Sequence, residues 1–243
     1  MNVAILFGRK NSKSIKNKNI LKILSKPMFM YPIDAAKKVK EINKIYVSSD
    51  SNHILTEAEK KGCIPIYRPK YLCNDKALLE DAIQHAVNYC QNKNNNLIEN
   101  FIILLCNSIC VRHSDIKKGL NILNKSKQFN TITTVSKFNN FSPVRAKKVK
   151  NHSLLNYIPN KNLKRFTPLS CDRDKSVHSY YCTQSFTISR AKVLKNMKKN
   201  PFPFNWMSEK TTFLFQDSCV GDIDFPWQIE ATKWWLKKYL IKS

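Results

Sequence analysis

The order of apolar and amphipathic segments in the first half of the chain is the feature that most constrains its fold. Short apolar runs suited to strands alternate with segments of helical period. The clearest helix is the one in which Leu79, Ile83, Ala86 and Cys90 recur at helical spacing. Alternating strands and helices build parallel sheets through right-handed crossovers, so the sequence predicts an α/β fold with a doubly wound, mostly parallel sheet. The predicted strands are 3–7, 44–50, 63–67, 101–106 and 131–136, and the predicted helices are 26–39, 51–61, 78–90 and 114–125.

The second half of the chain breaks this alternation once. From residue 139 to residue 178, Pro, Lys, Arg and Asn dominate and no period runs through the segment, which indicates an excursion from the sheet. Strands at 185–189 and 213–217 are predicted to follow, and then a closing helix over 227–241. The buried side of this helix is predicted to hold Ile229, Thr232, Leu236 and Tyr239. No repeat or linker divides the chain, so we expect residues 1–243 to form a single domain with the excursion as an insertion.

The chain is strongly basic, with 42 Lys and Arg against 17 Asp and Glu and a formal net charge of +25. Such a charge attracts polyanions in general. The Lys residues are spread along the whole chain together with many Asn, whereas a nucleic-acid-binding face requires clustered charge. The sequence therefore disfavours nucleic acid as a partner.

Compartment and redox state follow from what the sequence lacks. No apolar run approaches the roughly 18 residues of a membrane span. The N-terminus has neither the basic segment nor the small-residue cleavage site of a secretory signal. We expect a cytoplasmic protein with no membrane partner. The eight Cys form no C-x-x-C pair, so zinc and redox sites are not indicated and we expect reduced thiols.

A basic loop follows the first apolar run. The stretch FGRKNSKSIKNKNI, residues 7–20, contains one Arg, four Lys and three Asn. At the carboxyl end of a parallel strand, backbone N–H groups and cationic side chains can share the charge of a nucleotide phosphate. The loop matches neither G-x-G-x-x-G nor G-x-x-x-x-G-K-[ST]. On composition alone, a solvated Lys-rich loop is the simpler interpretation.

A pair of acidic residues precedes the closing helix. The sequence VGDIDFPW places Asp222 and Asp224 two residues apart, so in an extended segment both carboxylates project to one face and Ile223 to the other. Convergent carboxylates are hard oxygen ligands of the kind that hold Mg²⁺ together with substrate phosphates. An acidic turn that caps the helix is the alternative interpretation.

Together these segments resemble one family, the acylneuraminate (CMP-sialic acid) and related nonulosonic acid cytidylyltransferases. That family opens with a strand followed by R-G-G-S-K-G-I-P-x-K-N-I, and the corresponding stretch here is RKNSKSIKNKNI. Lys10 and Asn11 replace the two glycines after the arginine; Asn adopts the left-handed backbone conformation more readily than Lys. The identical positions are Arg9, Ser12, Lys13, Ile15, Lys18, Asn19 and Ile20.

The resemblance continues along the chain. IYVSSDSNHI is similar to the family's V-S-T-D segment, and YRPKYLCND, which contains Arg68, is similar to R-R-P-x-x-L-A-x-D. LLCNSICVR stands where the family has L-L-Q-P-T-S-P-L-R, with Ser108 in place of a Thr and Cys106 in place of a Gln that helps to hold substrate. The D-x-D before the last helix matches the family's metal-binding pair.

The resemblance implies a function and a site. It implies a Rossmann-like nucleotidyltransferase that transfers CMP from CTP to the anomeric hydroxyl of a nonulosonic acid, releases pyrophosphate, uses Mg²⁺ and forms a homodimer through the excursion at 139–178. Activation of Kdo or another keto sugar acid, and a catalytically impaired nucleotide-binding relative, stay open as alternatives. The implied residues are Arg9 and Lys13 for catalysis; Arg9, Ser12, Lys13, Lys18, Asn19 and Arg68 for the nucleotide; Ser108, Arg145 and Arg173 for the sugar acid; and Asp222 and Asp224 for the metal.

Overall fold

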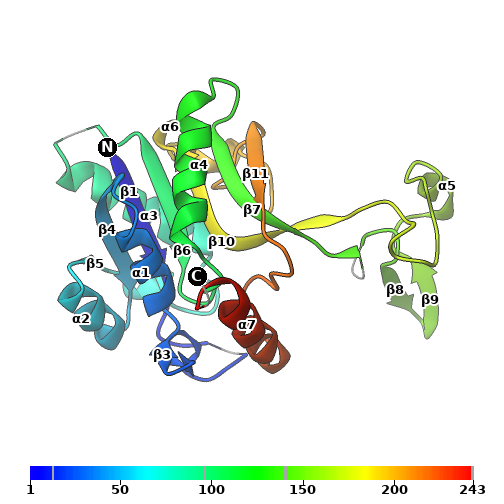
Figure 1. Cartoon of the computed structure of the whole chain (residues 1–243), viewed down its shortest axis with the longest axis horizontal. Coiled ribbons are helices and arrows are strands. Elements are labelled where there is room, and N and C mark those ends of the chain that lie inside the picture. The colour runs from blue at the N-terminus through cyan, green and yellow to red at the C-terminus, as the bar shows by residue number, and fades with distance from the viewer. Residues whose placement is uncertain (13, 96, 140–141, 242–243) are drawn as a thin grey trace.

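A computed structural model describes residues 1–12, 14–95, 97–139 and 142–241. Its main sheet has seven strands in the order β11-β7-β10-β6-β1-β4-β5 (Figure 1). In the described sheet β10 is antiparallel to both of its neighbours and the other neighbouring pairs are parallel, which confirms the predicted α/β class. The strands are β1 (Asn2–Phe7), β4 (Ile42–Ser49), β5 (Ile64–Tyr67), β6 (Asn100–Leu105), β7 (Thr131–Lys137), β10 (Tyr180–Arg190) and β11 (Thr211–Phe215), with two small hairpins, β2 (Lys22–Ile23) with β3 (Lys26–Pro27) and β8 (Lys147–Lys150) with β9 (Ser153–Asn156).

Helices cover both faces of the main sheet. One apolar layer joins α1, α2 and α4 to Ala4 and Leu6, and a second layer joins α3 and α6 to Val3 and Ile5. All six residues of β6 are buried, as expected of a central strand that is covered on both sides. Among the described residues, no helix is both long and apolar enough to cross a membrane. The helices are α1 (Met30–Lys37), α2 (Asn52–Lys60), α3 (Leu79–Lys93), α4 (His113–Lys125), α5 (Asn160–Leu163), α6 (Ala191–Leu194) and α7 (Pro226–Tyr239), with short 3-10 turns at Lys18–Ile20, Lys70–Leu72 and Met197–Lys199.

The first helix starts later than the sequence pattern predicts. A helix is predicted over 26–39, but α1 begins at Met30 because the preceding residues form the β2–β3 hairpin. The two turn residues of that hairpin, Leu24 and Ser25, have φ angles of 47° and 66°. Positive φ at both central positions matches the twist of a tight two-residue hairpin. Pro32 lies in the first turn of α1, where its missing N–H breaks no intrahelical bond, as predicted.

A third apolar cluster packs α7 against the β2–β3 hairpin and the loop that follows β6. The predicted buried side of α7 is confirmed at Thr232 and Leu236, and Trp235 contributes the largest fully buried side chain of the described residues. Ile109 from the loop after β6 and Ile223 from the segment before α7 belong to the same cluster. Because Ile223 is buried there, its two acidic neighbours are fixed relative to the end of β6.

The chain leaves the main sheet between β7 and β10. This segment, residues 142–179 and here called the arm, carries the β8–β9 hairpin and α5 and extends away from the sheet (Figure 1). A backbone hydrogen bond of 3.0 Å from Phe138 N to Ser179 O closes the strand pair at the root of the arm. None of the described arm residues belongs to the three apolar clusters. Apolar side chains of its hairpin lie open to solvent instead, with Val149 77% and Leu154 69% exposed.

Candidate active site

A cleft of about 330 Å³ opens at the carboxyl ends of β1, β5 and β6. Its walls come from four segments that are far apart in the sequence: the basic loop after β1, residues 68–79, the end of β6 and the D-x-D segment before α7. Parallel sheets bind ligands at this edge because the loops that follow neighbouring strands gather there. The cleft therefore lies where the sequence pattern predicts a site.

The basic loop, Gly8–Asn19, lines one side of the cleft. Lys10 N donates to Asp50 Oδ1 at 2.6 Å, and Asn19 Nδ2 donates to the Arg9 carbonyl at 2.8 Å, so the loop is tied to β4 and to itself. Among the described non-glycine residues of the loop only Asn17 has a positive φ, 54°. Lys10 and Asn11 thus avoid the left-handed conformation, and placing them where the family pattern has glycines introduces no backbone strain of that kind.

Gly8 is the position in the loop where a glycine is required. A Cβ atom here would lie 2.2 Å from Cys106 Sγ and 2.8 Å from Cys106 Cβ. Cys106 is fully buried, and burial raises the pKa of its thiol to about 12. At the position that resembles a substrate-holding Gln, this chain therefore has a side chain packed beneath Gly8 instead of one that lines the cleft.

Two arginines bring positive charge to the cleft. Arg9 Nη1 lies 3.5 Å from Asp75 Oδ1. Arg68 is held by Ser48, because its Nη2 donates to the Ser48 carbonyl at 2.8 Å and its Nε donates to the Ser48 hydroxyl at 3.3 Å. Burial lowers the pKa of Arg68, but a guanidinium keeps its charge in proteins. Both guanidinium groups line the cleft and add positive charge to it.

Lys18 joins the basic loop to the D-x-D segment. Its Nζ lies 2.6 Å from Asp224 Oδ1, and the Lys18 side chain is only 10% exposed. Asp222 and Asp224 both line the cleft, whereas Ile223 between them is fully buried, as the predicted alternation requires. The Ile223 amide donates to the Asn107 carbonyl at 3.0 Å, which attaches the acidic segment to the end of β6.

The surroundings of Asp222 disfavour the charged form of its carboxyl group. Its Oδ1 is buried and has no hydrogen-bond partner among the described residues. Burial and, to a smaller degree, the charge of Asp224 raise its pKa to about 7, while the nearby Ser108 hydroxyl and the charge of Lys18 act in the opposite direction. A buried carboxylate oxygen without a partner, next to a second carboxylate, is a position that a cation would satisfy. Among the described residues no group of three or more His, Cys, Asp or Glu could hold a metal, so phosphate and water oxygens would complete its shell.

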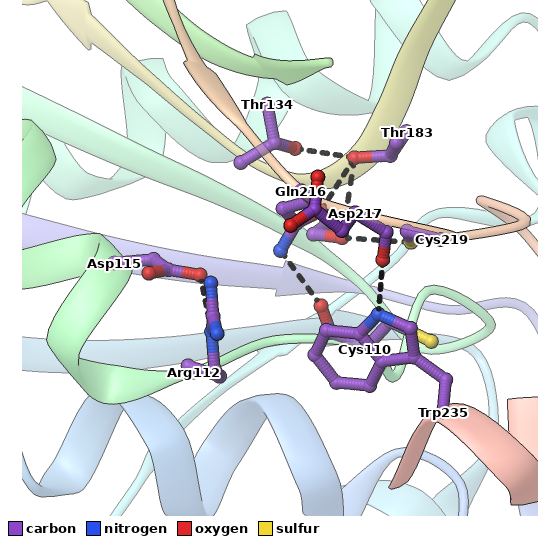
Figure 2. A network of polar contacts seen from close by, with 10 residues as sticks. Cys110, Arg112, Asp115, Thr134, Thr183, Gln216, Asp217, Cys219 and Trp235 are labelled. Carbon is purple, nitrogen blue, oxygen red and sulfur yellow. Dashed lines mark hydrogen bonds and ion pairs between the residues drawn. The ribbon is translucent and has the colours of Figure 1, made fainter. Parts of the chain in front are cut away.

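A buried polar network holds the chain that leads into the acidic segment (Figure 2). Gln216 accepts a hydrogen bond from Thr183 Oγ1 at 2.7 Å and donates through Nε2 to the Cys110 carbonyl at 3.0 Å. Trp235 Nε1 donates to the Asp217 carbonyl at 3.1 Å. These bonds tie β10, the loop after β6 and α7 to residues 216 and 217, shortly before the acidic pair. These hydrogen bonds therefore hold rigid the part of the chain that leads to the two carboxylates.

The cleft brings together most of the residues that the sequence predicts for the nucleotide and the metal. Those that line it are Arg9, Ser12, Lys18, Asn19, Arg68, Asp222 and Asp224. Lys13 lies outside the described residues.

The residues predicted for the sugar acid are not part of this cleft. Ser108 is fully buried, and its hydroxyl donates to the Thr183 carbonyl at 3.3 Å instead of lining the cleft. Arg145 lies on the arm and donates through Nη1 to the Cys171 carbonyl at 3.1 Å. Arg173 also lies on the arm, with Nε 3.7 Å from Asp174 Oδ2. Within one copy of the chain, the two arginines are thus separate from the acidic pair.

Two parts of the cleft are not predicted from the sequence. Asn107 lines it next to the acidic segment, and Leu72, Ala77 and Leu78 give it an apolar wall. The signal for Asn107 is its position directly after the central strand, at the edge where parallel sheets bind ligands. The apolar wall gives no such signal, because it comes from an irregular segment between β5 and α3.

Comparison with known proteins gives a consistent picture. A family model described as cytidylyltransferase matches residues 3–199. The chain is 31% identical over 150 residues, 61% of its length, to a pseudaminic acid cytidylyltransferase and UDP-2,4-diacetamido-2,4,6-trideoxy-beta-L-altropyranose hydrolase of Helicobacter pylori. It is 36% identical over 85 residues, 35% of its length, to an N-acylneuraminate cytidylyltransferase of Escherichia coli, and 36% identical over 94 residues, 38% of its length, to a pseudaminic acid cytidylyltransferase of Campylobacter jejuni. The matches span 28%, 20% and 40% of these relatives, less than half of each.

Solved structures share the fold over nearly the whole chain. A CMP:2-keto-3-deoxy-manno-octonic acid synthetase in complex with CTP aligns with a TM-score of 0.68 and 16% identity, over 98% of this chain and 99% of that one. A 4-diphosphocytidyl-2C-methyl-D-erythritol synthase from Anaerococcus prevotii aligns with a TM-score of 0.62 and 14% identity, over 97% of this chain and 96% of that one. At these identities the likeness shows the fold alone.

Proposed function

Because the chain belongs to the cytidylyltransferase family, we propose that it transfers CMP from CTP to a nonulosonic acid, a sialic-acid-like keto sugar acid. The anomeric hydroxyl oxygen of the acid attacks the α-phosphorus of CTP and forms the new P–O bond. The bond from that phosphorus to the oxygen bridging to the β-phosphate breaks, pyrophosphate leaves, and the hydroxyl proton passes to solvent. The observation that carries the proposal is the convergence of the basic loop with Asp222 and Asp224 in one cleft.

The two ends of the cleft differ in chemistry, and this difference supports one orientation of the nucleotide. The sheet order β6-β1-β4-β5 puts Arg68 at one end and Asn107 at the other, with the basic loop after β1 between them. The apolar wall of Leu72 and Leu78 is at the β5 end and suits a base. In the proposed complex the base lies there, the triphosphate lies along the basic loop, and the α-phosphate lies beside the acidic pair.

Charge stabilisation is the proposed work of the basic loop. Phosphoryl-type transfers depend on positioning and on groups that neutralise the charge of the transition state. Arg9 and Lys18 both line the cleft, and we assign Lys13 to the same task from its place in the sequence of the loop. Ser12 and Asn19 add neutral contacts to the nucleotide, and Arg68 contacts its base end.

Asp222 and Asp224 are the proposed ligands of Mg²⁺. The buried, unpartnered Oδ1 of Asp222 fits this assignment because a cation would relieve its desolvation. When bound, Mg²⁺ supplies Lewis-acid stabilisation of negative phosphate oxygens. The Lys18 ammonium holds Asp224 in place. The hydrogen bond from the Ile223 amide to the Asn107 carbonyl holds the backbone next to Asp222.

The arm is the proposed dimerisation element and a source of sugar-acid ligands. Arg145 and Arg173 sit on the arm outside the cleft of their own chain. In a homodimer whose arms cross, the partner subunit's Arg145 could make paired hydrogen bonds to the acceptor carboxylate, a geometry that Lys cannot reproduce. The exposed Val149 and Leu154 of the β8–β9 hairpin support the proposal, because association would bury them.

Two alternatives rest on specific observations. Kdo or another keto sugar acid is an alternative acceptor, since Cys106 does not supply the contact of the family's Gln. A catalytically impaired nucleotide-binding relative is the other, since Lys10 and Asn11 replace two glycines of the family pattern. The loop backbone without positive φ at these two positions counts against the second alternative.

The decisive experiment measures pyrophosphate release by the purified protein with Mg²⁺. Each common ribonucleoside triphosphate is paired with sialic, pseudaminic and legionaminic acids and with Kdo. The proposal expects release that requires CTP together with a nonulosonic acid and that is lost in Asp222→Ala but kept in Glu209→Gln, a matched control on an exposed residue. Release with Kdo alone would establish the first alternative. CTP binding without release from any pair would establish the second.

A further inference from the structure

Asn107 occupies a distinctive position at the end of the central strand. Residues 106 and 108–111 are buried, with exposed fractions of 1% or less, whereas Asn107 is partly exposed. It lines the same cleft as the acidic pair. A polar residue that alone remains accessible in an otherwise buried stretch is available to a ligand.

The backbone of Asn107 is fixed while its side chain is not engaged. The Asn107 carbonyl accepts the hydrogen bond from the Ile223 amide at 3.0 Å, so the residue is attached between the two acidic positions. Its side-chain amide makes no hydrogen bond within the described part of the chain, whereas the amides of Asn19 and Asn74, which also line the cleft, bond to backbone carbonyls. Asn107 thus offers an N–H₂ donor and a carbonyl acceptor on a rigid base.

The place of Asn107 in the cleft selects which substrate it can contact. Arg68 and the apolar wall lie at the β5 end, whereas Asn107 lies at the β6 end beside Asp222. In the proposed orientation, the base occupies the β5 end and the α-phosphate lies beside the acidic pair. The acceptor must approach the α-phosphorus from the side opposite the departing pyrophosphate, and the β6 end is the part of the cleft left open to it.

We propose that Asn107 is a specificity-determining residue whose side-chain N–H₂ donates a hydrogen bond to the carboxylate of the acceptor. This inference rests on the proposed function and names a recognition element of the same site. A carboxylate that enters beside Asp222 and Asp224 meets like charge, so a donor is needed on this wall to hold it. The amide supplies that donor without a positive charge that would compete with the metal for the acidic pair.

The test compares wild type, Asn107→Ala and Asn107→Ser with the acceptor that wild type uses. Asn107→Ala is expected to raise the acceptor KM about 10- to 100-fold, because a hydrogen bond to a charged group is lost. The CTP dissociation constant from calorimetry should stay within about twofold of wild type. Asn107→Ser keeps a donor and should recover part of the loss. Asn121→Ala, on the exposed face of α4, is the matched control and should behave as wild type.

A modified acceptor separates direct contact from a structural effect. Wild type should lose efficiency with the methyl ester of the acceptor. With the ester, Asn107→Ala should be nearly as efficient as wild type, because the ester has already removed the contact. An unchanged acceptor KM in Asn107→Ala, or an equal loss with acid and ester, would overturn the inference while the proposed function stands. Absence of pyrophosphate release by wild type with every acceptor would instead overturn the proposed function, and the inference with it.

Discussion

Replacing Asp222 by Asn should make the metal-free protein more stable while it abolishes activity. The Oδ1 atom of Asp222 is buried without a partner among the described residues, and the carboxylate lies next to Asp224. Asn has nearly the same shape and carries no charge, so it removes the cost of burying the anion. Asp224→Asn should have the opposite effect on stability, because it leaves the Lys18 ammonium, 10% exposed in its side chain, without its 2.6 Å partner.

The size of the stability gain in Asp222→Asn and its pH range follow from the pKa of Asp222, which is raised from 3.8 to about 7. A carboxyl whose pKa is higher in the folded protein contributes stability below its unfolded pKa and loses that contribution as pH rises through the folded pKa. At about 1.4 kcal/mol for each pH unit, the loss between pH 4 and pH 7 is at most about 4 kcal/mol. Asp222→Asn should therefore gain about 2–4 kcal/mol over wild type at pH 8 and nothing near pH 4. Asp224→Asn should lose about 1–2 kcal/mol at neutral pH.

Urea unfolding in the presence of a chelator, repeated from acidic to mildly alkaline pH, measures these differences. Glu209→Gln, an exposed carboxylate, is the matched control and should leave the pH profile unchanged. Adding Mg²⁺ with CTP should stabilise wild type and not Asp222→Asn. An Asp222→Asn variant that is less stable than wild type at pH 8, or a gain that does not shrink on acidification, would refute the reasoning.

Three further predictions test other parts of the site. Gly8→Ala should cost about 1–3 kcal/mol of unfolding free energy, because its Cβ would lie 2.2 Å from Cys106 Sγ. Adding Cys106→Ala to the same chain should restore part of this loss. Losses that are additive in urea titrations would contradict the contact. Lys18→Met should lower kcat/KM for CTP about 100-fold in the pyrophosphate assay, whereas exposed Lys22→Met should not, and equal effects would argue for a general charge effect. Iodoacetamide at mildly alkaline pH should label exposed Cys171 in the native protein, while Cys90 and Cys106, whose pKa values burial raises to about 12, should react only after denaturation; peptide mass spectrometry distinguishes these outcomes.

The parallel core was predictable because its strands are buried on both faces and therefore appear as continuous apolar runs, as in β6. The start of α1 was not predictable in the same way. The hairpin that displaces it turns at Leu24 and Ser25, neither of which is a usual residue for positive φ. Tertiary contacts of the hairpin with α7 in the third apolar cluster decide that conformation, and a local pattern does not contain them.

Some residues of the candidate site were also predictable from the sequence and others were not. Asp222 and Asp224 could be assigned to one surface because a period of two residues fixes where extended side chains point. Ser108 and Asn107 could not be separated from sequence, because a loop has no period to say which residue faces the cleft and which faces the core. The structure buries Ser108 and turns Asn107 toward the cleft. The separation of Arg145 and Arg173 from the cleft was not predictable either, because it depends on the path of the arm.

The root of the arm has a consequence for how this molecule can vary. β7 and β10 pair with each other, and the Phe138–Ser179 backbone bond closes their ladder where the arm departs and returns. In topological terms the arm is the tip of one long hairpin, so a short turn in its place would leave every strand of the main sheet with its neighbours. Loop-closure entropy changes slowly with length. Evolution, or a protein engineer, can therefore exchange the arm as a separate unit while the candidate cleft, built on β1, β5 and β6, stays unchanged.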